Sequence, residues 1–306
     1  MQLVSDALAA LKLGAPQAHA NLALFPLIAE SDRDAGYLLL DDALERKLAR
    51  ITEVSAEGRV PELAFENASA EPILLVDGDE LAGAKQNRIL NLSILVGAGA
   101  SLTIPVSCVE QGRWRYRRSD FASAGRTLFA KGRAHKMAEV TASMRATQSR
   151  AADQSRIWAD VAEKVAFSGV NSATLAMGDV YESRAEELDD YLRSFSPAPR
   201  QVGALVLIDG RAAGIELFDS SAAFERYLPK LVRSYALDAL ETLGSEPIAP
   251  SEAAARGFLE RLCNAAAESA PALGEGEDVR LTGSGIAGGA LVAGGRVVHL
   301  AGFQIS

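Results

Sequence analysis

Short apolar or alternating runs dominate the chain from about residue 21 to 116, and turn-rich pieces such as "SDRDAG", "SAEGRV" and "GAGA" separate them. This pattern indicates strands, because successive side chains of a strand point to opposite faces. Seven runs at this spacing predict antiparallel pairing in a sandwich or a strongly curved sheet. They are "NLALFPLI", "GYLLLDDAL", "LARITEVS", "PELAFENAS", "PILLVDG", "RILNLSILV" and "SLTIPVSCVE". The overlapping piece "LDDALERKL" also fits a single helical turn.

The pattern changes between about 122 and 195, where Ala, Arg, Glu, Gln and Met recur with helical periodicity and strand signals disappear. "GRAHKMAEVTASMRATQSRAADQSRIWADVAEKVAFSG" predicts one long helix or two, with Ile157, Val161 and Val165 in an apolar stripe. "NSATLAMGDVYESRAEELDDYLRSF" predicts another helix, which the prolines of "SPAPRQ" end. The opening "MQLVSDALAALKLG" reads as an amphipathic helix rather than a signal peptide.

From 202 to 304 strand and helix patterns alternate. "VGALVLIDGRAAGIELF" predicts a hairpin that turns at Asp209 and Gly210. Helices are expected from Ser220 to Leu243 and from Ser251 to Ala267, and "DVRLTGSGIAGGALVAGGRVVHLAGF" then predicts two or three strands with glycine turns.

These segregated blocks of strands and helices predict an α+β fold rather than regular βαβ alternation. We expect one domain over residues 1–306, made of a β-rich part (21–116), a helical part (122–195) and a mixed part (202–304) that completes it. The proline-rich break at 197–201 is the alternative place for a domain boundary.

Composition narrows the class of protein. With 48% hydrophobic and 23% charged residues, the chain is typical of a soluble globular protein. The net charge of -9 disfavours a broad nucleic-acid or anionic-membrane surface, so a phosphate-bearing partner should be small. Two distant cysteines indicate a reducing compartment, and no apolar run reaches the roughly 18 to 20 residues of a membrane span. The cytoplasm is the expected location.

Two short motifs resemble known functional sites, but the residues around them do not fit those sites. Gly283, Gly285 and Gly288 spell GxGxxG, but a glycine-punctuated hairpin follows where a dinucleotide site needs a helix. Cys108 and Arg113 have four residues between them, one fewer than a cysteine-phosphatase loop requires, and Glu110 would repel the anion.

The histidines do not indicate a metal. His19, His135 and His299 are scattered, and none has metal-ligand spacing to another. No serine sits in a nucleophile elbow, and Walker and HExxH motifs are absent. We therefore expect no metal site, and the sequence specifies no cofactor.

Two segments remain, "DGDELAGAKQNR" and "CVEQGRWRYRR". The first lies between two apolar runs and the second follows the next strand, so antiparallel pairing would bring both to one rim. Lysine and arginine suit phosphate, amides suit a base or ribose, tryptophan offers a stacking face, and a tuned glutamate can act as general base. The candidates are Glu80 and Glu110 as catalytic residues, and Lys85, Gln86, Asn87, Arg88, Gln111, Arg113 and Trp114 as ligand-binding residues.

Interpretations that involve no ligand also fit these residues. "GAKQNR" can be a solvated hairpin tip and "GRWRYRR" an edge strand protected by its charges, although "KQNR" matches ordinary turn chemistry poorly. A second polar set lies in the helical part, either on a solvated helix face or on a helix that covers the strand rim. Its members are Arg145, Gln148, Asp153, Gln154 and Trp158.

"DGDELAGAKQNRILNLSILV" followed by "IPVSCVEQGRW" resembles the signature of the ADP-ribosylglycohydrolase and rhodanese-phosphatase superfamily-associated protein domain family. "SRIWADVAEKV", "GALVLIDGRAAGIELFDS" and "LPKLVRSYALDAL" extend the resemblance over nearly the whole chain. The resemblance implies a role beside enzymes of ADP-ribose adducts and phosphoesters. It places signature positions at Gly83, Lys85, Gln86, Asn87, Arg88, Cys108, Glu110, Gly112, Arg113 and Trp114.

Three functional hypotheses follow. The first is an enzyme, a hydrolase or transferase, that processes ADP-ribose or another small phosphorylated nucleotide. The second is a non-catalytic sensor or accessory module that binds such a ligand for partner enzymes of the ADP-ribosylglycohydrolase or phosphatase type. The third is a scaffold whose rim contacts protein. None involves nucleic acid or a membrane.

Overall fold

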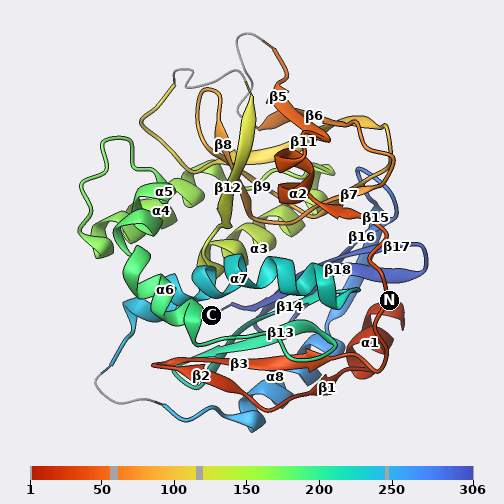
Figure 1. Cartoon of the computed structure of the whole chain (residues 1–306), viewed down its shortest axis with the longest axis vertical. Coiled ribbons are helices and arrows are strands. Elements are labelled where there is room, and N and C mark those ends of the chain that lie inside the picture. Colours follow the sequence, from red (N-terminus) through yellow and green to blue (C-terminus); the bar gives the residue numbers. More distant parts are fainter. Residues whose placement is uncertain (1, 56–60, 115–119, 245–247, 306) are drawn as a thin grey trace.

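The computed structural model describes residues 2–55, 61–114, 120–244 and 248–305. Its strands form a nine-stranded sheet, a curled six-stranded sheet and a small three-stranded sheet, and helices cover and separate them (Figure 1). The architecture is α+β with antiparallel sheets, as the sequence predicts. Within the described residues, no helix is long and apolar enough to cross a membrane.

The nine-stranded sheet joins the two ends of the chain. Its order is β1-β3-β13-β14-β18-β17-β16-β15, with β2 paired to β3. Because side chains alternate along a strand, Ala204 and Val206 of β13 face one core while Leu205 and Leu207 face another. The strands are β1 (Lys12–Leu13), β2 (Gln17–His19), β3 (Leu22–Ile28), β13 (Gln201–Ile208), β14 (Arg211–Phe218), β15 (Ala266–Pro271), β16 (Glu277–Gly283), β17 (Ile286–Ala293) and β18 (Arg296–Gln304).

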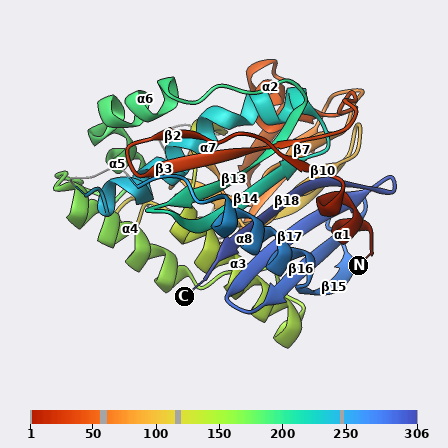
Figure 2. The same ribbon diagram turned by 90° about the horizontal axis from the view of Figure 1, so that it is seen from below.

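Helices pack on both faces of this sheet. One face carries α1 (Gln2–Ala9) and α8 (Glu252–Cys263), and the other carries α3 (Ala130–Thr147) and α7 (Ser221–Glu241) (Figure 2). Together the two layers bury both apolar faces of the strands, which is why β13 reads as a continuous apolar run in the sequence.

The curled six-stranded sheet has the order β12-β8-β9-β11-β6-β5, and its edge strands β5 and β12 approach each other. Its inward residues form a separate core. The strands are β5 (Ala49–Glu53), β6 (Glu62–Asn67), β8 (Asp79–Gly83), β9 (Arg88–Leu90), β11 (Ser101–Cys108) and β12 (Phe121–Thr127). The small sheet, β10-β7-β4, contains β4 (Leu38–Leu39), β7 (Ile73–Leu75) and β10 (Ile94–Val96), and α2 (Leu40–Glu45) follows β4.

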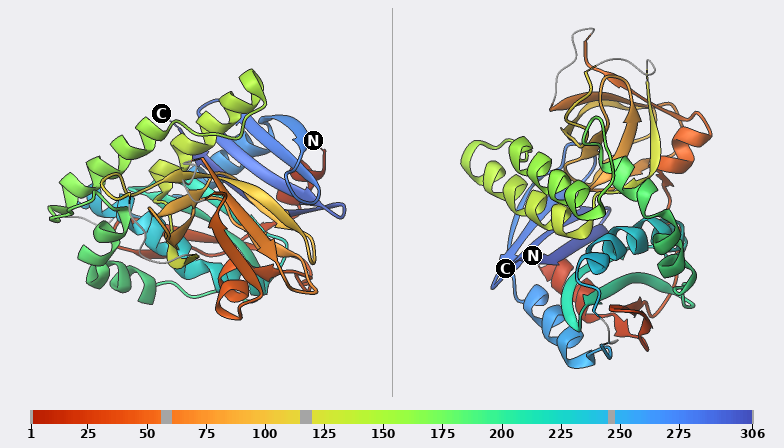
Figure 3. Two further views of the ribbon diagram at one scale, coloured as in Figure 1. Left: turned by 90° about the horizontal axis from the view of Figure 1, so that it is seen from above. Right: turned by 90° about the vertical axis from the view of Figure 1, so that its left-hand side faces the viewer.

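The helical part of the chain lies between the two large sheets (Figure 3). It contains α3, α4 (Gln154–Ser168), α5 (Met177–Ser183) and α6 (Ala185–Arg193). Asp153 caps α4 by accepting from the backbone N–H groups of Ser155 and Arg156. α4 contacts β11 of the curled sheet and thereby connects the helices to the strands of the candidate site.

Three local predictions are wrong. Residues 122–127 were expected in the helical part but form most of β12, because an edge strand with a bulge tolerates the weak strand formers of "FASAGRT". β8 was not predicted, since its apolar residues are few. The helix expected to reach Ala267 ends at Cys263, and Ala266 already pairs with β16. The single-domain organisation over 1–306 stays a prediction.

Candidate functional site

The first candidate segment forms the tight turn between β8 and β9. Gly83 is required there, because a Cβ atom would lie 2.3 Å from the carbonyl oxygen of Asp120, the residue directly before β12. Ala84 follows with a positive φ of 34°, and its N–H donates to the same oxygen at 3.3 Å. The chain reverses so closely that the next four side chains point into the protein. Lys85, Gln86, Asn87 and Arg88 are all at most 8% exposed, so the interpretation as a solvated hairpin tip is wrong.

The second segment reaches the same place through strand register. Cys108 at the end of β11 pairs with Arg88 at the start of β9. Beyond β11 the chain turns at Gly112, whose N–H donates to the carbonyl of Thr174 at 2.9 Å and whose missing Cβ would clash with that residue. The two segments therefore meet, as predicted. We call the resulting cluster the corner; it consists of Glu80, Lys85, Gln86, Asn87, Arg88, Cys108, Glu110, Gln111, Arg113 and Trp114.

Arg113 holds the two halves of the corner together. Its Nε donates to Glu110 Oε2 at 2.8 Å, and its other nitrogens donate to the carbonyls of Ala84 (2.7 Å) and Gly83 (3.2 Å) and to Asn87 Oδ1 (3.0 Å). Burial by itself would raise the pKa of Glu110, but the hydrogen bonds and charge of Arg113 hold it below its ordinary value. Glu110 is thus ionised and firmly paired at neutral pH.

Glu80 is engaged in the same way. One carboxylate oxygen accepts from Asn87 Nδ2 at 2.8 Å, and the other accepts from Arg126 Nε of β12 at 2.6 Å. Glu80 is 1% exposed. A buried, doubly bonded carboxylate of this kind fixes the position of its partners.

Arg88 lies in the interior of the corner. Its Nη1 donates to Gln86 Oε1 at 2.7 Å and contacts Cys108 Sγ. Burial lowers the pKa of the Arg88 guanidinium and raises the pKa of the Cys108 thiol to about 11, so Cys108 is a neutral thiol rather than a nucleophile. The backbone of Cys108 exchanges two hydrogen bonds with the side chain of Gln154 on α4, at 2.7 and 2.8 Å.

The outer side of the corner is open to solvent. Trp114 is 49% exposed, with Lys85 Nζ 5.2 Å and the Arg88 guanidinium carbon 5.7 Å from the centre of its indole. Gln111 has an exposed side chain, while its carbonyl oxygen accepts from Gln86 Nε2 at 3.4 Å. These distances suit cation–π contacts, so the indole presents one face to solvent beside two cations.

The second polar set does not act as a unit. Gln154 binds the end of β11, so α4 does reach the strand rim there. Arg145, in contrast, pairs with Glu268 on the far sheet, and Asp153 caps α4. The charged run expected as an edge strand continues into residues 115–118, which lie outside the described residues.

A ligand-sized groove lies at the gap between β5 and β12. Its volume is about 610 Å³, and α2, Arg50, Asp120, Phe121 and Arg226 are among its walls. One wall residue of the groove, Phe121 of β12, pairs with Gly83 of β8, which directly precedes the corner residues. The groove and the corner therefore lie on neighbouring strands. The corner residues Lys85, Gln86, Asn87 and Arg88 are buried against one another, and none of them is among the walls of this groove.

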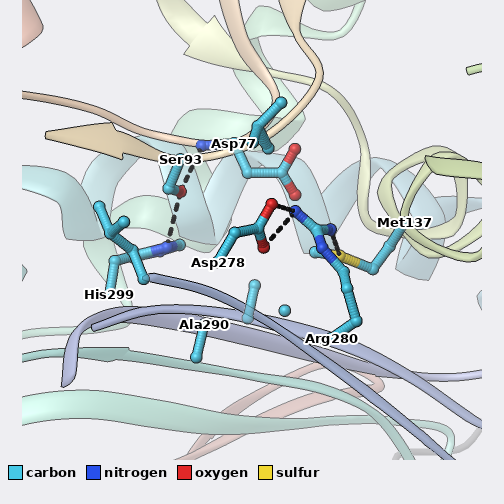
Figure 4. Close-up of a pocket in the computed structure, with 11 residues that line it drawn as sticks. Asp77, Ser93, Met137, Asp278, Arg280, Ala290 and His299 are labelled. Carbon is cyan, nitrogen blue, oxygen red and sulfur yellow. Dashed lines mark hydrogen bonds and ion pairs between the residues drawn. The ribbon is translucent and has the colours of Figure 1, made fainter. Parts of the chain in front are cut away.

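A second group of buried polar residues was not predicted. It surrounds a cavity of about 10 Å³ between the curled sheet and the strands β16 to β18, which has room for about one water molecule (Figure 4). Arg280 pairs with Asp278 at 2.7 Å and donates to the sulfur of Met137 at 3.2 Å. We call this small cavity the junction cavity. It is lined by Asp77, Leu92, Ser93, Met137, Asp278, Arg280, Gly289, Ala290, Leu291, His299 and Ala301.

Ion pairs around the junction cavity connect the two sheets. Lys136 of α3 contacts Asp77 and donates to the carbonyls of Leu90 (2.9 Å) and Asn91 (3.1 Å). Burial lowers the pKa of the Lys136 ammonium well below its ordinary value, and the adjacent Asp77 carboxylate favours the charged form. This buried pair joins α3 to the segment that follows β7 and so helps to fix how the two units pack, although Asp77 Oδ2 accepts no hydrogen bond from a described residue.

Ser93, His299 and Glu216 follow one another in hydrogen bonds. Ser93 Oγ lies 2.9 Å from His299 Nδ1, His299 Nε2 lies 3.1 Å from Glu216 Oε2, and Arg133 pairs with Glu216. The order is that of a nucleophile, base and orienting acid. The cavity beside them leaves no room for an acyl substrate, so we assign the series to structure.

The sequence did contain a signal for this second group. His299 in "VVHL" and Arg280 in "DVRL" are polar residues inside strongly apolar strands, which marks buried polar positions. Their partners lie on distant segments, so the sequence could not group them. Over the described ranges, no cluster of three or more His, Cys, Asp or Glu residues is placed to hold a metal ion.

Comparison with known proteins gives one match. The family model described as the ARG and Rhodanese-Phosphatase-superfamily-associated Protein domain matches residues 10–303. No curated protein and no solved structure matches the chain. The family name links the domain to the ADP-ribosylglycohydrolase and rhodanese-phosphatase superfamilies, in an associated role.

Proposed function

Because the chain belongs to the family of ARG and Rhodanese-Phosphatase-superfamily-associated Protein domains, we propose that it binds a small phosphorylated nucleotide, such as ADP-ribose or a derivative, at the outer side of the corner. The observation that carries the proposal is the half-exposed indole of Trp114 with the cations of Lys85 and Arg88 against it. An aromatic face stacks a base in a sequence-tolerant way, and an adjacent ammonium attracts phosphate.

Within this proposal, the corner residues divide into two groups. Trp114 and Gln111 contact the ligand because they are exposed, and Lys85, although only 8% exposed, contacts it because its Nζ lies 5.2 Å from the centre of the exposed indole. Arg113 and Asn87 are positioning residues, since Arg113 is committed to Glu110 and Asn87 to Glu80. The packing supports binding more strongly than turnover, because a general base needs a pKa near the working pH, whereas Glu110 is held below its ordinary value.

An accessory role for partner enzymes agrees with the same observations. The name of the family describes association with enzyme superfamilies rather than a reaction. We propose that the bound nucleotide is presented to, or reported to, a partner of the ADP-ribosylglycohydrolase or phosphatase type. Processing by this chain itself is the second candidate, with Glu110 or Glu80 moving the proton.

Thermal-shift measurements and titration calorimetry with ADP-ribose, ADP, ribose 5-phosphate and NAD test the proposal. We expect ADP-ribose to raise the melting temperature, and mass spectrometry of the incubated ligand then separates binding from turnover. Loss of one base-stacking contact costs about 1–3 kcal/mol, so Trp114→Ala should weaken binding by about fivefold or more. Lys85→Ala should weaken the binding of the ligands that carry phosphate.

Matched controls are available on exposed positions elsewhere. Phe167→Ala removes an aromatic side chain that is 47% exposed on α4, and Lys12→Ala removes an exposed lysine of β1. Neither should change affinity. Arg88→Ala is a poor probe, because Arg88 is fully buried and its removal tests folding. If no phosphorylated nucleotide shifts the melting temperature, or the control variants lose as much affinity as the corner variants, the proposal is wrong.

A further inference from the structure

The curled sheet changes from apolar to polar at one end of its interior. Val106 pairs with Leu90 in the apolar core, and the next inward position along the same two strands holds Cys108 opposite Arg88. On β5, Glu53 follows two residues after the core residue Ile51 and therefore faces the same way. Burial lowers the pKa of the Arg88 guanidinium, and the negative charge of Glu53 opposes that lowering, so Glu53 lies in the neighbourhood of Arg88. Three inward positions thus converge on a polar end.

Two of these side chains carry unsatisfied hydrogen-bonding atoms. Nε and Nη2 of Arg88, and both carboxylate oxygens of Glu53, are shielded from solvent and make no hydrogen bond to any part of the chain that the structure describes. Arg88 is 0% exposed. A buried charged group without partners costs free energy of folding, so such a pair needs an explanation.

The polarity of these atoms selects the chemistry of a ligand. Arg88 offers donors and Glu53 offers acceptors, and together they carry no net charge. A phosphate would meet the Glu53 carboxylate and a metal cation would meet the Arg88 guanidinium, so neither fits the pair. A neutral group with a donor and an acceptor side by side satisfies both. The amino and ring-nitrogen or carbonyl edge of a purine has this arrangement.

We infer that Arg88 and Glu53 recognise the edge of an amino-substituted purine base, adenine or guanine, whose face stacks on Trp114. This inference rests on the proposed nucleotide-binding function and names the part of the ligand that the corner reads. The base amino group donates to Glu53, and a ring nitrogen or carbonyl oxygen accepts from Arg88. The centre of the Trp114 indole lies 5.7 Å from the guanidinium carbon. Base recognition therefore requires a side-chain movement at Trp114 that admits the base to the buried pair. The phosphates then extend outward past Lys85.

Ligands without phosphate separate this inference from the proposed function. Adenosine, guanosine, purine riboside (which lacks the amino group) and ribose 5-phosphate are titrated against the wild-type protein by calorimetry. We expect adenosine or guanosine to bind, and purine riboside to bind about tenfold more weakly, because Glu53 then stays unpaired. This comparison needs no variant, so it holds even where a substitution disturbs folding.

Glu53→Gln provides the second readout. This substitution keeps the shape of the side chain and removes its charge. It should weaken the binding of adenosine or guanosine about tenfold and leave the affinity for ribose 5-phosphate unchanged. Glu66→Gln, at an exposed position of β6, is the matched control and should change neither.

Each outcome decides between the two claims. If ribose 5-phosphate and ADP-ribose bind while the nucleosides do not, or if Glu53→Gln has no effect on them, the base-recognition inference is overturned and the proposed function stands. If the nucleosides bind and adding phosphate groups does not increase affinity, the base-recognition inference stands and the proposed preference for a phosphorylated ligand is wrong. If nothing binds, both are overturned.

Discussion

Substitution of Arg113 by leucine tests whether this residue positions the corner. Leucine keeps apolar volume but removes the guanidinium that bonds Glu110 at 2.8 Å, two carbonyls and the Asn87 amide. Glu110, 1% exposed, would keep Thr174 Oγ1 at 3.0 Å and the Asn87 N–H at 3.2 Å but lose its counter-charge. Removing one partner of a buried ion pair costs about 3–5 kcal/mol of unfolding free energy.

The expected effect on melting follows from the chain length. An unfolding entropy of about 2.1 cal/mol/K per residue over 306 residues gives about 0.64 kcal/mol/K, so the melting temperature should fall by about 5 to 8 °C. Differential scanning calorimetry measures this directly. Arg50→Leu is the control and should shift it by about 1 °C or less, because Arg50 is an exposed residue of β5 whose side chain makes no hydrogen bond to a described residue. A loss below about 1 kcal/mol for Arg113→Leu would refute the positioning role.

Three further substitutions test the same framework. Gly83→Ala should destabilise the protein by about 2–4 kcal/mol, because its Cβ would meet a backbone carbonyl oxygen, whereas Gly99→Ala, in open space, should lose only about 1 kcal/mol in chemical denaturation. The folded-state pKa of Glu110 lies below its ordinary value of 4.5, so the stability that this carboxylate contributes is present above about pH 4.5 and is lost as the pH falls through the folded-state pKa. Glu110→Gln should therefore make the melting temperature fall less steeply in acid. An unchanged pH profile of the melting temperature would contradict this. Lys136→Met should cost about 3–5 kcal/mol, and adding Asp77→Asn should recover part of it, since the pair is buried; a double variant less stable than the single one would argue against the pairing.

Much of the fold follows from local patterns in the sequence. The hairpin of β13 and β14 turns at Asp209 and Gly210 as predicted, because Asp-Gly suits the backbone conformation of that turn. α1 and α7 form where the sequence predicts helices, at the start of the chain and between Ser220 and Leu243. β12 was missed because pairing with β8, not the strand propensity of its own residues, makes "FASAGRT" a strand.

The candidate site was predictable in position but not in the role of each side chain. Hairpin geometry alone predicts that the residues after Gly83 and after Cys108 meet, and they do. Arg113 was expected to hold phosphate, yet its donors are turned toward Glu110 and the turn carbonyls. Glu53 was overlooked, because nothing in "LARITEVS" distinguishes an inward glutamate from a solvated one until the sheet curls.

The sequence by itself determined the elements and the meeting of the two polar segments, because turn chemistry and strand register act over short distances along the chain. Only the tertiary structure decided which charges neutralise each other. Lys136 finds Asp77, and His299 finds Ser93 and Glu216, across separations of 59 to 206 residues. Such pairs form because burial makes an unpaired charge costly, and which groups are buried together depends on how the two sheets pack.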